Sequence, residues 1–342
     1  MSATSKPNAK QAARLQLGER LTRGGKPLPA AFLEEQVELA RRYSLVEKLV
    51  LGGTQVSYSP ASLEVELDLK GNVIEQGEKL AVAERARHNL LAGPVLEIEA
   101  LVEEQGLKVI ARRFPQDATS LGAFFFDGDI GPTILVNASA GPADVSYIVA
   151  RQYGHFLADY EPYPYIVCGR PDPQSLDNAA DMRAHVFALA FLMPEKDLNV
   201  YCDAMKLERD QVLHAEFLQQ LQVYFEVDAE LILWRLLSLG WITAPQLKQF
   251  LEKEPAIAEC LLQAPQRHPG NDELPDRFVQ LVAHGFGQDK LTLSEAADVL
   301  GVEEAEAERL LSQFRYEDGD ASTPSPSDAS LDDPFPEGES LH

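Results

Sequence analysis

The sequence contains little of what secreted, membrane or disulfide-stabilised proteins need. Only three cysteines occur in its 342 residues, Cys168, Cys202 and Cys260, and none lies in a C-x-x-C pair. We therefore expect reduced thiols, and neither a disulfide framework nor a cysteine-based zinc site. The chain also lacks the run of about eighteen apolar residues that a transmembrane helix needs. Its first ten residues lack the apolar core of a secretory signal. These absences predict a cytoplasmic protein.

Positive charge is scarce as well. The chain has 30 Lys and Arg against 54 Asp and Glu, for a formal net charge of −24. Proteins that bind nucleic acids gain much of their affinity by neutralising phosphates, so this balance opposes direct nucleic acid binding. Neither a P-loop nor a G-x-S-x-G motif occurs. Basic residues gather only in residues 1–28, which we expect to be a solvated, flexible segment: Lys6, Lys10, Arg14, Arg20, Arg23 and Lys26.

Hydrophobic periodicity predicts an α+β fold with a small sheet of three or four strands. Helical spacing of apolar residues predicts mainly helical structure over 196–315, and separate helices at 29–51, 79–91, 95–105, 142–160 and 176–192. Alternating or continuous apolar runs predict strands at 63–69, 107–114, 123–128 and 132–137. A hairpin turn is expected at Asp127-Gly128. Prolines predict an irregular loop at 161–173: Pro162, Pro164, Pro171 and Pro173.

These elements divide the chain into five expected segments. The basic segment 1–28 precedes a helix and strand unit at 29–80. A central domain covers 81–250, and a helical C-terminal domain covers 251–315. The last segment, 316–342, is acidic and rich in Ser and Pro, so we expect it to be disordered.

Four landmarks within 80–250 resemble the ImmA/IrrE family of bacterial and phage metallopeptidases. In chain order they are A-V-A-E-R-A-R-H-N-L-L, the strand I-L-V-N followed by the helix V-A-R-Q-Y-G-H-F-L, then D-M-R-A-H-V-F-A-L-A-F-L-M-P, and finally Y-F-E-V-D-A-E-L-I-L-W-R-L-L-S-L-G-W-I. The third is similar to the family's E-x-x-A-N-x-F-A-x-x-L-L-M-P. The resemblance implies a zincin-like core, in which a small sheet and two active-site helices hold zinc.

In the family, an H-E-x-x-H helix supplies two zinc ligands and a general base, and the next helix supplies a third ligand. The resemblance places these roles on Arg151, Gln152, His155 and Asp181, in the order first ligand, base, second ligand and third ligand. Arg151 is a permanent cation without a lone pair, so it cannot bind a metal. Gln152 cannot accept a proton from metal-bound water near neutral pH. The standard peptidase mechanism is therefore not available.

We favour a catalytically degenerate member of this fold with no bound cofactor. Arg151 is expected to lie where zinc would lie, paired with Asp181. The resemblance implies a regulatory protein partner in a bacterial or phage stress or repressor circuit. A groove for an extended peptide or partner is expected along the strand 134–137 and the neighbouring loop, with the residues Ile134, Leu135, Val136, Asn137, Tyr163 and Tyr165.

Two alternatives stay open. A relocated metal site could use His155 with Asp159 and Asp181 with His185, because each pair has i, i+4 spacing on one helix and the resemblance implies that the two helices face each other. Such a site would leave zinc and a metal-dependent peptidase activity available. His185 stands where the family usually has Asn. The other alternative is a DNA-binding regulator, because residues 291–311 have the spacing of a helix-turn-helix, although its second helix is acidic.

Overall fold

The computed structural model describes residues 28–52, 71–90, 92–116, 118, 120–159, 165–169, 179–206, 212–253 and 274–314. Three predicted segments lie outside these residues: residues 1–27 of the basic segment, the strand at 63–69 and the acidic segment 316–342. The described helices are α2 (Ala30–Val50), α3 (Val73–Arg87), α4 (Ile98–Glu104), α5 (Pro142–Asp159), α6 (Ala179–Leu192), α7 (Glu195–Met205), α8 (Ala215–Phe225), α9 (Ala229–Ser238), α10 (Ala244–Lys253), α12 (Asp276–Gly287), α13 (Leu293–Leu300) and α14 (Glu304–Ser312).

A four-stranded mixed sheet lies at the centre, which confirms the α+β class. Its strands are β1 (Lys108–Arg112), β2 (Ser120–Asp127), β3 (Gly131–Asn137) and β4 (Tyr165–Gly169), in the spatial order β1-β3-β2-β4. β1 and β3 are parallel, whereas β2 pairs antiparallel with both β3 and β4. The expected hairpin joins β2 to β3, and its turn is closed by a hydrogen bond from the Ile130 amide to the Asp127 carbonyl.

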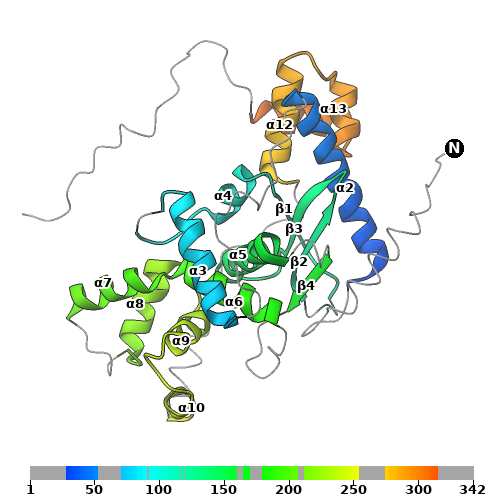
Figure 1. Ribbon diagram of the computed structural model, residues 1–342. Helices are drawn as coiled ribbons and strands as arrows, with labels where there is room; N and C mark the ends of the chain where they lie inside the picture. The colour runs from blue at the N-terminus through cyan, green and yellow to red at the C-terminus, as the bar shows by residue number, and fades with distance from the viewer. Residues whose placement is uncertain are drawn as a thin grey trace, which may run out of the picture.

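The two faces of the sheet pack on different helices, because side chains alternate along each strand. Phe124, Ile134 and Val136 belong to a core with residues of α5, α6 and α9. Phe125 and Leu135, one position away, belong to a second core with residues of α2 and α12–α14. Figure 1 shows α5 on one side of the sheet and α2 on the other. Within the described part of the chain, no helix combines the length and the apolar character that crossing a bilayer requires.

Two predicted boundaries differ from the structure. The boundary at residue 80 falls inside α3, which begins at Val73 because the Asn72 side chain accepts a hydrogen bond from the Ile74 amide and caps the helix. The unit at 29–80 and the domain at 251–315 are not separate bodies, since α2 packs on α12 and α13 (Figure 1). Sequence periodicity shows which residues are buried but not which distant helix covers them.

The predicted loop at 161–173 is wrong for its middle part, where β4 forms. The prolines of this segment flank the stretch Y-I-V-C-G, which itself contains none, so its amides are free to pair with β2. Tyr165 is therefore a buried strand residue and not part of an open loop. Tyr163 lies outside the described residues.

The predicted groove along β3 is also wrong. β3 pairs with β1 on one side and with β2 on the other, so its backbone has no edge to which a peptide could add. Ile134, Leu135 and Val136 are fully buried between the helical layers. The alternation of apolar residues identified the strand correctly, but it could not show whether the strand lies at an edge or inside the sheet.

The packing of α3 on α6 leaves no room for a side chain at Gly77. A Cβ on this residue would lie 2.8 Å from both the Arg183 carbonyl oxygen and the Val186 Cβ. We expect Gly77→Ala to lower the free energy of unfolding by about 1–3 kcal/mol, measured by urea denaturation, because overpacking outweighs the better helix propensity of alanine. Gly287→Ala is the control, since a Cβ there meets nothing within 4 Å. Equal effects of the two changes would contradict the close approach.

Candidate functional site

α5 presents a row of polar side chains to the helix layer. Arg151, His155 and Asp159 follow one another at i, i+4 spacing, so they lie on one face of the helix. All three are almost completely buried, as is the neighbouring Gln152. Buried charges need partners, and α6 and β4 provide them.

Arg151 bridges β4 and α6. Its Nη1 donates to the Gly169 carbonyl at 3.1 Å and its Nη2 donates to Asp181 Oδ1 at 2.8 Å. Burial by itself lowers the pKa of Arg151, but interactions with Cys168, Tyr147 and Asp181 outweigh it and raise the pKa above its ordinary value. The guanidinium is therefore charged at every accessible pH, and the expected Arg151–Asp181 contact is present.

His155 lies beside Arg151 and has partners at both ring nitrogens. Nδ1 is 3.3 Å from Asp159 Oδ2, whereas Nε2 is 3.4 Å from Asp181 Oδ1. Burial alone lowers the pKa of His155, but Cys168, Asp159 and Asp181 together raise it well above its ordinary value. The ring is therefore an imidazolium at neutral pH when nothing else binds it.

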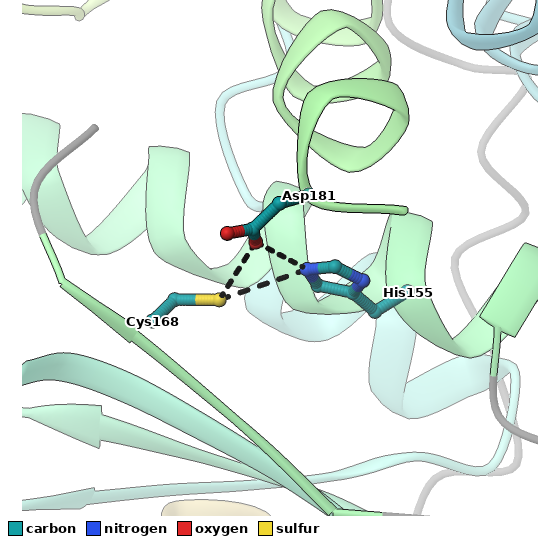
Figure 2. A group of neighbouring side chains, drawn as sticks. All are labelled: His155, Cys168 and Asp181. Carbon is teal, nitrogen blue, oxygen red and sulfur yellow. Dashed lines mark hydrogen bonds and ion pairs between the residues drawn. The ribbon is translucent and has the colours of Figure 1, made fainter. Parts of the chain in front are cut away.

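Cys168 of β4 completes the group, and the sequence did not lead us to it. Its Sγ lies 3.6 Å from His155 Nε2 and 3.9 Å from Asp181 Oδ1. Figure 2 shows the three side chains pointing toward one another, from a strand and two helices. Successive residues of a strand point to opposite faces of the sheet. Had β4 been predicted as a strand, this alternation would have placed Ile166 and Cys168 on the face opposite to Tyr165 and Val167, toward α5 and α6.

Asp181 is the carboxylate that Arg151, His155 and Cys168 all contact. Burial tends to raise its pKa, but the hydrogen bond with His155 and the charge of Arg151 outweigh burial and hold the pKa below its ordinary range. The carboxylate is consequently ionised, and a single oxygen, Oδ1, faces Arg151, His155 and Cys168.

The predicted four-residue metal set does not assemble. Asp159 lies on the Nδ1 side of His155, opposite the side that Asp181 contacts, and its other oxygen accepts from Arg183 Nη2. His185 points elsewhere, since its Nδ1 lies 2.7 Å from the Tyr147 hydroxyl and its ring packs on the edge of Trp234. The i, i+4 spacing fixed the helix face of each residue but not the direction of its side chain.

The resemblance places the family's general base at Gln152. It is completely buried, and neither its amide nitrogen nor its amide oxygen has a hydrogen-bond partner among the described residues. An amide has no proton-accepting group of useful basicity near neutral pH. This position therefore carries no group that could act as a general base.

Zinc in the family's coordination does not fit these residues. The resemblance places the first ligand at Arg151 and the third at Asp181. The Arg151 guanidinium has no lone pair, and it donates to the Asp181 carboxylate. We therefore derive no hydrolytic step that passes through a metal at this position.

The site lies in a part of the chain that matches a known protein family. Residues 102–237 match the family described as the IrrE N-terminal-like domain, a group of peptidases. No curated protein matches the chain significantly. The matched range runs from α4 to α9 and includes all the site residues described above. Residues 102–237 thus form a domain of the ImmA/IrrE family.

Proposed function

We propose that this protein is a catalytically inactive member of the ImmA/IrrE family, which acts by binding a regulatory protein partner. The observation that carries the proposal is the buried Arg151, which pairs with Asp181 where the family holds its metal. Gln152 supports it, because a peptidase of this type needs a base at that position. The regulatory partner is what the family resemblance implies for a fold retained without its chemistry.

The two alternatives receive less support. The relocated peptidase needs His155, Asp159, Asp181 and His185 around one ion, and the structure does not bring them together. For the DNA-binding alternative, α13 and α14 do form a helix pair, but the N-cap residue Glu303 and the α14 residues Glu304 and Glu308 are exposed. Those carboxylates would repel phosphates. Both observations favour a protein partner over a substrate or DNA.

Restoring the family residues tests the loss of peptidase chemistry. We expect the wild-type chain, supplied with zinc, to cleave an unstructured protein such as casein no faster than a buffer control. The Arg151→His/Gln152→Glu variant regains the first ligand and the base, and we expect it to gain hydrolysis that a chelator abolishes. The measurement is the release of new amino termini over time.

The matched control is Arg151→His alone, which restores a ligand without the base and should stay inactive. Chelator-sensitive hydrolysis by the wild-type chain that disappears in His155→Ala would overturn the proposal. The partner is sought by affinity capture with the full chain and then verified by titration of the two purified proteins. If the wild-type chain hydrolyses casein and no protein forms a saturable complex with it, the protein is an enzyme and the proposal is wrong.

A further inference from the structure

The donor atoms of His155, Cys168 and Asp181 form a triangle close to the size that a tetrahedral metal ion requires. The observed edges are 3.4 Å from Nε2 to Oδ1, 3.6 Å from Sγ to Nε2 and 3.9 Å from Sγ to Oδ1. Zinc bonds of about 2.0–2.3 Å at tetrahedral angles give edges of roughly 3.3–3.6 Å between such donors, so the two edges at Nε2 fit and the Sγ–Oδ1 edge has to shorten on binding. The atoms also lie within 4.8 Å of one another as a group, on three different elements (Figure 2).

The surroundings of His155 are those of a metal-binding histidine. Its Nδ1 faces the Asp159 carboxylate, which leaves Nε2 toward Cys168 and Asp181. A carboxylate on the far ring nitrogen commonly fixes the orientation of a histidine ligand and raises its basicity. Asp159 is itself held by Arg183, whose other nitrogen donates to Gln76 at 2.7 Å. The carboxylate that orients His155 is therefore held in place before any ion binds.

We propose that His155, Cys168 and Asp181 bind a divalent d-block cation such as Zn²⁺, with Cys168 of β4 replacing the ligand that the family has at position 151. This set keeps His155 and Asp181, which the resemblance makes the second and third ligands, and it adds Cys168, which neither the resemblance nor helical spacing singled out. A thiolate, an imidazole and a carboxylate suit zinc or cobalt better than magnesium or calcium. The ion would tie β4 to α5 and α6.

The site also explains how Arg151 can remain beside a cation. The thiolate and the Asp181 carboxylate supply two negative charges for the ion, and Arg151 contacts Asp181 and the Gly169 carbonyl. Its positive charge opposes a second cation nearby, so it weakens binding without removing a ligand. The inference is independent of the proposed function, because Gln152 lacks basicity whether or not an ion is bound.

Cobalt provides a direct test, because a cobalt–thiolate bond gives a charge-transfer absorption band in the near ultraviolet. The full chain, without a histidine tag, is treated with chelator under reducing conditions and titrated with Co²⁺. We expect one equivalent to bind with this band, and zinc to displace it. In Cys168→Ser the band disappears and binding weakens at least 10-fold, whereas Cys202→Ser, which changes the other described buried cysteine, leaves both unchanged.

Two further variants separate the site from nonspecific uptake. His155→Ala should abolish stoichiometric binding, and Arg151→Met should tighten it by about 10-fold because a like charge is removed. Circular dichroism of each variant without metal shows that the fold is intact. A folded wild-type chain that takes up no cobalt, or a band that persists in Cys168→Ser, would overturn the inference. Neither result bears on peptidase activity, so the proposed function is tested by the hydrolysis experiment alone.

Discussion

We expect Asp159→Ala to lower the free energy of unfolding by about 3–5 kcal/mol, since removing one partner of a buried ion pair leaves an uncompensated charge. The Asp159 side chain is 2% exposed and that of Arg183 is 6% exposed. Asp159 also accepts from His155 Nδ1. Its loss therefore leaves two buried cationic groups without their acceptor. Urea denaturation at neutral pH measures the change.

A double-mutant cycle with Arg183→Met distinguishes an ion pair from a simple packing defect. If Asp159 and Arg183 stabilise each other, the double variant loses less than the sum of the two single variants, because the stranded guanidinium is gone. Asp298→Ala is the control, since Asp298 is an exposed acid on α13, and its effect should stay within about 0.5 kcal/mol. Strictly additive losses would show that the two side chains do not interact in solution.

The part of the fold that sequence patterns predicted is the part held by local rules. Pro142 at the first turn marked the start of α5, and Asp127-Gly128 marked the hairpin between β2 and β3. The predicted helices at 142–160 and 176–192 correspond to α5 and α6. Each of these features depends on residues close together in the chain.

The features that could not be predicted depend on contacts between distant segments. β4 is a strand because its amides pair with β2, more than thirty residues earlier in the sequence, although prolines flank it. Cys168 consequently went unnoticed as a neighbour of His155. Asp159 and His185 were assigned to the correct helix faces, but hydrogen bonds to Arg183 and Tyr147 turned them away from a common centre. Such side-chain directions are decided by partners that spacing does not show.

His185 gives the second large effect, which appears only in acid. Burial and the positive charge of Arg151 lower the pKa of His185 to about 3, and Asp181 opposes them only in part. In the unfolded chain the same ring titrates near 6.5, so below that pH the unfolded state binds a proton that the folded state refuses. Stability contributed by the neutral ring is therefore present above pH 6.5 and lost as the pH falls toward 3.

We expect His185→Asn to remove this dependence. At pH 7.5 the variant should be less stable than the wild type by about 1–2 kcal/mol, because the contact with Tyr147 changes. At pH 5 the comparison should move by about 2 kcal/mol in favour of the variant, so that its deficit disappears or reverses, since the wild type alone has this histidine to protonate on unfolding. Urea denaturation at several pH values measures both. His155 titrates in the opposite sense, but it is present in both proteins and cancels in the comparison.

The comparison with an exposed histidine decides whether burial is the cause. His284 lies exposed on α12, so His284→Asn should keep the same difference from the wild type at pH 7.5 and at pH 5. Parallel stability curves for His185→Asn and the wild type would mean that water reaches His185 and that its ring protonates in the folded state. The packing of Trp234 and Tyr147 around it would then be looser than the structure shows. If only His185→Asn changes its stability relative to the wild type between pH 7.5 and pH 5, burial in the helix layer keeps the His185 ring neutral, although Asp181 lies one helical turn away.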